Sequence, residues 1–151
     1  MKTSLRGRGG VARVGPADLD DLRAFQRRHF GPDSRQADEA AFAWRFERHP
    51  LRGPDGPDLW IARREGQVVG QQAILPFPLR VGDGERRAAW AIDLMVAPEW
   101  RLCGVGPALY GEVQQSEATL CGLGVSDDAL PAFRRAGWLD LDRVPRWLRL
   151  L

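Results

Sequence analysis

The spacing of hydrophobic residues changes at Leu59. Before this point, apolar side chains recur at intervals of three and four residues, as they do on one face of a helix. The residues that carry this spacing are Leu19, Leu22, Phe25 and the pair His29-Phe30. After Leu59, apolar and polar residues alternate, which is typical of strands with one buried face. The pattern therefore predicts a short strand over residues 11–14, a helical segment, and then a sheet.

Prolines, glycines and short polar residues mark the boundaries of the predicted helices. Pro16 can open the first helix, and Gly31-Pro32 ends it. Asp33 or Ser34 is expected to cap a second helix, which must stop before Pro50. The apolar residues of this second helix are Phe42, Trp44 and Phe46.

Three strands are predicted between residues 59 and 96, where they form an antiparallel meander behind a loop over residues 52–58. Glu65-Gly66 and Gly82-Asp83-Gly84 are turn signals, and Pro76 and Pro78 indicate an edge or a bend. Strict alternation in the last strand, residues 87–96, would place its side chains on two opposite faces. One face would carry Trp90, Ile92, Leu94 and Val96, and the other Ala91, Asp93 and Met95.

Behind these strands the pattern predicts a helix, a strand and another helix. Residues 118–125 form a short apolar segment that is expected to pair in parallel with the strand before the third helix. Asp127 or Asp128 is expected to cap the last helix, with Gly137 as its C′ glycine. Residues 138–151 are predicted to hold one or two further strands.

A glycine-spaced turn joins the strand over residues 87–96 to the third helix. Arg101, Gly104 and Gly106 follow the spacing R-x-x-G-x-G. A strand that feeds such a turn points backbone N–H groups and the positive end of a helix dipole at an anion. Glycine matters here because a Cβ atom would block the approach of the backbone to a phosphate. We therefore interpret this turn as a phosphate cradle.

Composition narrows the class of protein. The chain has 151 residues, of which 44% are hydrophobic and 28% charged, so we expect one soluble domain over residues 11–151. Residues 1–10 are basic and glycine-rich and are interpreted as a flexible lead-in. The formal net charge of +2 does not demand a nucleic-acid partner. A nucleic-acid-binding protein is an alternative that rests only on the basic start and the isoelectric point of about 8.9.

The sequence gives no indication of a membrane or metal partner. No apolar run approaches the ~20 residues of a membrane-spanning helix, and the start has no signal-peptide core, so we expect a cytoplasmic protein. Cys103 and Cys121 are too few for a disulfide framework or a zinc site and are expected to be free thiols. The oligomeric state is left open, a homodimer included.

The order of predicted elements and the cradle together resemble one known superfamily. The string R-x-x-G-x-G, preceded by Val96-Ala97-Pro98-Glu99-Trp100, resembles the pyrophosphate loop of the GNAT acyl-CoA-dependent N-acyltransferases. The segment 92–96 and the pair Gly137-Trp138 resemble a narrower group within it. The resemblance implies an α/β (α+β) fold with a mixed, mostly antiparallel sheet of six to seven strands flanked by about four helices. It also implies acetyl-CoA or another acyl-CoA as cosubstrate.

The same resemblance assigns cofactor-binding residues to the strand, the cradle and the last helix. They are Leu94, Met95, Val96, Arg101, Leu102, Cys103, Gly104, Val105, Gly106, Ala108, Ser126 and Phe133. The strand residues would lie along the pantetheine arm and offer an amide to the thioester carbonyl. Two positions depart from the family pattern. Pro107 has no N–H to donate, and Cys103 stands where many relatives carry a cation.

Asp93 is the candidate catalytic residue because it interrupts an apolar strand. A buried lone charge is costly, so Asp93 must face a cleft, a partner or solvent. It could bind the incoming ammonium or help remove its proton, or it could be a structural or solvent-facing carboxylate. Glu99 is a weaker candidate.

Phe133 stands where many relatives have a proton-donating tyrosine, and Ser126 where an asparagine is common. The leading hypothesis is an N-acyltransferase, with acetyl transfer favoured, that acts on a primary amine of a small molecule, sugar or peptide by direct attack in a ternary complex. The alternative is a catalytically degenerate binding or interaction module of the same fold.

Overall fold

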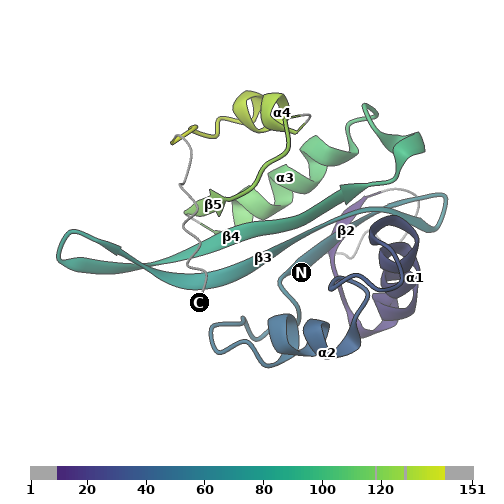
Figure 1. Cartoon of the computed structure of the whole chain (residues 1–151), viewed down its shortest axis with the longest axis horizontal. Helices are drawn as coiled ribbons and strands as arrows, with labels where there is room; N and C mark the ends of the chain where they lie inside the picture. Colours follow the sequence, from purple (N-terminus) through teal and green to yellow (C-terminus); the bar gives the residue numbers. More distant parts are fainter. Residues whose placement is uncertain (1–9, 118, 128, 142–151) are drawn as a thin grey trace, which may run out of the picture.

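The computed structural model describes residues 10–117, 119–127 and 129–141. Its centre is one sheet with the strand order β1-β2-β3-β4-β5. The strands are β1 (Val11–Arg13), β2 (Leu59–Arg64), β3 (Gln67–Val81), β4 (Gly84–Val96) and β5 (Leu120–Gly122). The helices are α1 (Leu19–Phe30), α2 (Glu39–Phe42), α3 (Val105–Ser116) and α4 (Leu130–Arg135). Helices α3 and α4 lie on one side of the sheet, and α1 and α2 lie on the other (Figure 1).

Every pair of neighbouring strands is antiparallel except β4 and β5, which are parallel. The mixed, mostly antiparallel sheet and the four helices confirm the predicted fold class. The predicted count of six to seven strands differs, because the described residues form five. Residues 138–141 are not in a strand, and the rest of the predicted tail strands lies outside the described residues.

The two predicted hairpins are both present. Glu65 and Gly66 have φ angles of 51° and 81°, the left-handed pair that a two-residue hairpin turn needs. Strand β2 begins opposite Ala73, so Pro76 and Pro78 lie where β3 has only β4 as a neighbour. The prolines therefore lie on an edge, as predicted, and they leave the hairpin of β3 and β4 extending beyond the rest of the sheet (Figure 1).

The helix caps follow the sequence prediction in part. Asp38, not Asp33 or Ser34, caps α2, and its Oδ1 accepts from the Ala41 N–H at 2.6 Å. The Oγ of Ser34 instead accepts from the Ala37 N–H at 3.2 Å, within the turn that precedes the helix. A π-helical turn, η2 (Ala43–Glu47), continues α2.

Helix α4 also begins differently from the prediction. Its N-cap residue is Ala129, with no side-chain cap, and Asp128 lies outside the described residues. At the other end Gly137 has φ 85° and donates to the Arg134 carbonyl, while Trp138 donates to the Phe133 carbonyl. These two bonds form a Schellman motif, which confirms Gly137 as the C′ glycine.

Each face of the sheet carries its own apolar cluster. The cluster under α3 contains Trp60, Ala62, Val69, Ile74, Ala89, Val105, Leu109 and Val113. The cluster under α1 and α2 contains Val14, Leu22, Phe42, Phe46, Leu59, Ile61 and Ala73. Helix α3 approaches β3 closely at Gly70, where an added Cβ would lie 3.0 Å from Cγ1 of Val105. The start of α3 is thereby fixed against the sheet.

A bulge in β4 overturns the predicted alternation of faces. Between the pairs Gln71–Met95 and Ala73–Ile92, Gln72 of β3 is opposite two residues of β4, Asp93 and Leu94. Asp93 has φ 53°, in the left-handed region. The extra residue changes the phase of the strand, so Ile92 packs on the α1 side whereas Leu94 and Val96 pack on the α3 side. Strict alternation had placed these three side chains together.

Candidate active site

The glycine-spaced turn forms a tight connection between β4 and α3. After Ala97, a single 3-10 turn, η3 (Pro98–Trp100), leads to Arg101, which is extended. Leu102 and Gly104 then have φ angles of 62° and 79°. These two left-handed residues reverse the chain within residues 101–104, and α3 begins directly after Gly104. The N-terminal turn of α3 therefore lies next to the end of β4.

The backbone of this turn is open on its outer side. A Cβ atom built on Gly104 or Gly106 would meet no other atom within 4 Å. Between them, Val105, the first residue of α3, is 1% exposed and packs against the sheet. Val105 thus anchors the turn while its two glycine neighbours leave room for a group to approach the main chain. The residues present fit a phosphate ligand, although Pro107 supplies no N–H.

A cleft of about 340 Å³ lies in front of the turn. It is lined by Val96, Arg101, Leu102, Gly104, Gly106, Pro107, Tyr110, Ala132 and Arg135. The cleft thus brings together five of the residues predicted to bind the cofactor. Its far wall comes from α4, through Ala132 and Arg135.

Arg135 is a residue that sequence reasoning missed. In the sequence the pair Arg134-Arg135 is typical of a solvated face, and Arg134 pairs with Asp140 at 2.7 Å. Arg135 lines the cleft together with Arg101, whose Nε donates to the Val96 carbonyl at 3.2 Å. Arg135 thus adds a second cation to Arg101 in the cleft, whereas Cys103, at a position where many relatives carry a cation, is uncharged in its thiol form. No local signal distinguishes Arg135, because the packing of α4 against the cradle is a tertiary contact.

The edge of β4 beside the cleft has no neighbouring strand in the described chain. Strand β5 pairs with β4 only from Ala89 to Ala91 and ends at Gly122. Beyond Ala91 no described strand pairs with β4 on this side, so the edge is free along the predicted pantetheine-binding residues Leu94, Met95 and Val96. Main-chain groups alternate between the two edges of a strand, and the Ala97 N–H donates to Val69 on β3. The groups of Met95 therefore also face β3, and those of Leu94 and Val96 face the free edge. A linear group with amides could bind along this edge.

The other residues predicted to bind the cofactor do not line the cleft. Cys103 and Ala108 are exposed, and both cysteines are free thiols, as predicted. The carbonyl of Ser126 accepts the N–H groups of Ala129 and Leu130, so Ser126 starts the α4 turn.

Phe133 is buried and packs between two other aromatic rings. Its ring centroid lies 4.7 Å from that of Tyr110 and 4.9 Å from that of Trp138. Tyr110 is 3% exposed, and burial raises the pKa of its phenol to about 12. The only tyrosine of the chain therefore lines the cleft as a neutral group.

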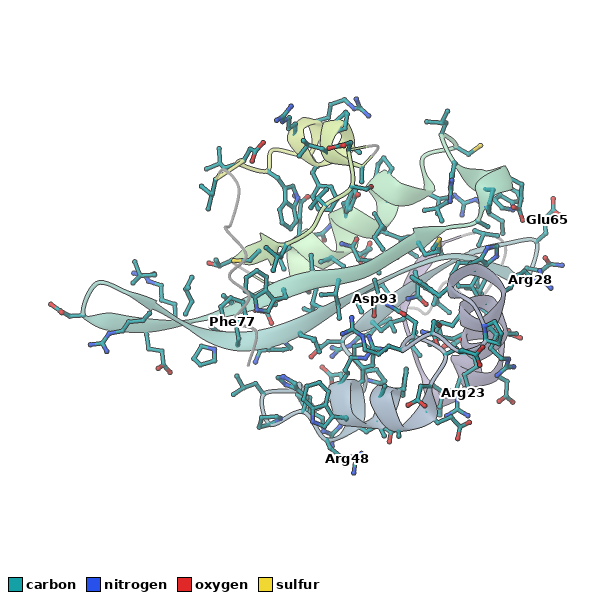
Figure 2. The ribbon with its side chains drawn as sticks, viewed as in Figure 1. Arg23, Arg28, Arg48, Glu65, Phe77 and Asp93 are labelled. Carbon is teal, nitrogen blue, oxygen red and sulfur yellow. The ribbon has the colours of Figure 1, made fainter. Side chains whose placement is uncertain are left out.

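Asp93 lies on the other side of the sheet from the cradle, facing α1 and α2. Figure 2 shows it between the sheet and these helices. Its side chain is 6% exposed and forms an ion pair with Arg45. Of the two interpretations of this residue, the contact supports a structural carboxylate, since the charge already has a buried partner.

A second cavity, of about 540 Å³, lies at the opposite end of α3. Arg13, Arg52 and Arg87 contribute to its wall. Arg13 pairs with Asp58, and Arg87 pairs with Glu117 at 2.7 Å. These ion pairs hold loops together and leave the cavity without a concentrated charge.

Comparison with known proteins identifies the family. A sequence model described as acetyltransferase (GNAT) domain matches residues 11–115, more than half of the chain. The chain therefore belongs to the GNAT acetyltransferase family. No protein among the curated sequences matches it. None of the helices in the described ranges is long and apolar enough to cross a membrane.

Solved structures of acetyltransferases share the fold. The aminoglycoside N-acetyltransferase AAC(6')-Iy in complex with CoA has a TM-score of 0.70 and 16% identity, covering 97% of this chain and 99% of that chain. A predicted acetyltransferase from Clostridium acetobutylicum, solved with acetyl-CoA, has a TM-score of 0.67 and 18% identity, with 95% and 96% covered. An acetyltransferase from Trypanosoma brucei has a TM-score of 0.66 and 20% identity, with 94% and 99% covered.

Proposed function

We propose that this protein is an N-acyltransferase that moves an acetyl group, or another acyl group, from acyl-CoA to a primary amine of a small molecule, sugar or peptide. The observation that carries the proposal is the cleft at the N-terminus of α3, where Gly104 and Gly106 leave the main chain open between Arg101 and Arg135. The similar structures that contain CoA or acetyl-CoA support the same cosubstrate.

The residues around the cleft divide the binding of acyl-CoA between them. The cradle amides and the dipole of α3 hold the pyrophosphate, with Arg101 and Arg135 as counter-charges. The free edge of β4 at Leu94, Met95 and Val96 binds the amides of the pantetheine arm. Bound in this way, acyl-CoA supplies an activated thioester. The cradle follows the end of β4, so a pantetheine arm that runs back along the strand places the thioester near the bulge at Asp93.

The amine attacks the thioester directly in a ternary complex. A C–N bond forms, the C–S bond breaks, the amine loses a proton and the thiolate gains one. Phe133 has no hydroxyl to donate, so water protonates the thiolate. Positioning of the two reactants then provides most of the rate. The acceptor approaches from the side of α1 and α2, and the similar aminoglycoside acetyltransferases support a small-molecule amine.

The test is a calorimetric titration of the chain with acetyl-CoA, with dephospho-CoA and pantetheine as controls. We expect micromolar binding of acetyl-CoA and dephospho-CoA but not of pantetheine, because the cradle binds pyrophosphate. An amine panel, read out by release of free CoA thiol, then identifies the acceptor class.

Two outcomes of this test count against the proposal. No binding of acetyl-CoA by a sample with a cooperative thermal transition contradicts it and favours the degenerate module that Phe133 and Pro107 motivate. Equal binding of pantetheine and acetyl-CoA would show that the phosphates do not lie on the cradle.

A further inference from the structure

The carboxylate of Asp93 is held by two side chains from the helical layer. Arg45 Nη1 donates to its Oδ2, and Gln36 Nε2 donates to its Oδ1 at 2.7 Å. The Arg45 and Asp93 side chains are only 2% and 6% exposed. Both oxygens are therefore occupied and the negative charge is neutralised. A carboxylate in this state is poorly suited to accept a proton from an incoming amine.

The main chain of Asp93 is held as well. Its carbonyl accepts from Gln71 Nε2 at 3.1 Å, and Gln71 Oε1 accepts from Gln26 Nε2 at 3.1 Å. A left-handed conformation is uncommon at residues other than glycine, although aspartate and asparagine adopt it more readily than most, and the contacts around Asp93 select it here. The φ of 53° at Asp93 is thus maintained through both its side chain and its carbonyl.

Arg45 is itself fixed in three directions. Its Nε donates to the Ala41 carbonyl at 3.4 Å, and its Nη2 donates to the Arg35 carbonyl at 3.3 Å. Its Cζ lies 4.9 Å from the centroid of the Phe46 ring. Phe46 is buried in the apolar cluster under α1 and α2. The guanidinium therefore ties the segment 35–45 rigidly to one point of β4.

We propose that Arg45 is a positioning residue for acyl transfer, which holds the β4 bulge in place through Asp93. The inference rests on the proposed function. A one-residue bulge exchanges which main-chain groups point to each edge of a strand. Here it determines which amides between Leu94 and Val96 face the free edge beside the cleft. Arg45 thereby couples the helical layer, from which the acceptor approaches, to the strand that binds the thioester.

The test compares Arg45→Met, Asp93→Asn and the double variant, with Arg48→Met as control. Arg48 is an exposed arginine three residues further on, at the outer side of the molecule (Figure 2). Each single variant should lower kcat at least about tenfold while the KM for acetyl-CoA changes less than about threefold. Arg45→Lys, which keeps the charge but loses the carbonyl contacts, should recover part of kcat. Arg48→Met should behave as wild type.

The double variant separates positioning from stability. Each single variant leaves one buried charge unpaired, whereas Arg45→Met with Asp93→Asn leaves none, so its thermal stability should recover. Asparagine also tolerates a positive φ. Its kcat should stay low, because Arg45 no longer holds the bulge. Recovery of both stability and kcat to wild-type values would overturn the inference and leave the pair a purely structural role.

A readout without turnover keeps this inference separate from the proposed function. Amide NMR shifts and hydrogen exchange of residues 94–96 should change in the double variant and stay unchanged in Arg48→Met. Unchanged amides in a folded double variant would overturn the inference, whatever the wild-type chain does with acetyl-CoA. Failure of the wild-type chain to bind acetyl-CoA would instead overturn the proposed function.

Discussion

The phenol ring of Tyr110 packs against Phe133, with ring centroids 4.7 Å apart and planes tilted by 57°. This contact holds α4 against α3, and both helices contribute to the lining of the cleft. The contact also buries the only tyrosine of the chain, so its titration can be followed without interference from another phenol.

We predict that Tyr110 makes stability depend on pH in the alkaline range. Burial raises its pKa from 10.0 to about 12 in the folded chain. A raised pKa means that the unfolded chain loses the proton first, so this contribution is fully present below pH 10 and is lost as pH rises to about 12. Phenolate absorbance should titrate near pH 12 when folded and near pH 10 in urea. Tyr110→Phe should flatten the alkaline stability curve, and an unchanged curve would contradict the assignment.

The second prediction concerns the open face of the cradle. Gly106→Leu should weaken acetyl-CoA binding at least about tenfold, or ~1.4 kcal/mol, because the new side chain occupies the space for the phosphates. The matched control is Gly111→Leu, on the same helix and also with open space at Cβ, but outside the cleft. Calorimetry should find that the affinity of the control variant for acetyl-CoA changes less than about twofold. Equal losses in both variants would assign the effect to the helix and not to the cleft.

The third prediction separates two neighbouring arginines of α4. Arg135→Met should weaken acetyl-CoA binding about fivefold, or ~1 kcal/mol, and should reduce its dependence on salt. Arg134→Met removes a cation that pairs with Asp140 away from the cleft, so it should leave the affinity nearly unchanged. Titrations at low and high ionic strength provide the measurement. The same affinity and salt dependence in Arg135→Met and wild type would remove Arg135 from the binding site.

The fourth prediction concerns the contact between α3 and the sheet. In Gly70→Ala, the new Cβ would lie 3.0 Å from Val105 Cγ1 and 3.2 Å from both Leu109 Cδ1 and the Met95 carbonyl. Overpacking of this kind costs about 1–3 kcal/mol. Urea denaturation should show a lower midpoint with an unchanged slope. Gly111→Ala is the control, because the space at its Cβ is open and alanine favours a helix. Equal midpoints for Gly70→Ala and wild type would contradict the close packing.

Much of the fold could be predicted because its signals are local. The periods of apolar residues located the helices and strands, and the glycines at 66, 104 and 137 all adopt positive φ angles at chain reversals. The R-x-x-G-x-G turn, which was interpreted as a phosphate cradle, lies at the wall of a cleft. The prediction of Asp33 or Ser34 as the cap of α2 was wrong, although the signal for a cap is local. Asp38 directly precedes Glu39–Phe42, and Ser34 closes an earlier turn.

The sequence by itself determined the order of elements, the turns and the residues of the cradle, because each depends on a few neighbouring residues. Only the tertiary structure decided the phase of β4, the ion pair of Arg45 with Asp93, and the place of Arg135 in the cleft wall. Arg45 and Asp93 are 48 residues apart in the chain, and the bulge is defined by the register of β4 against β3. Contacts between distant segments leave no periodic trace in either segment, so they form only when both are packed together.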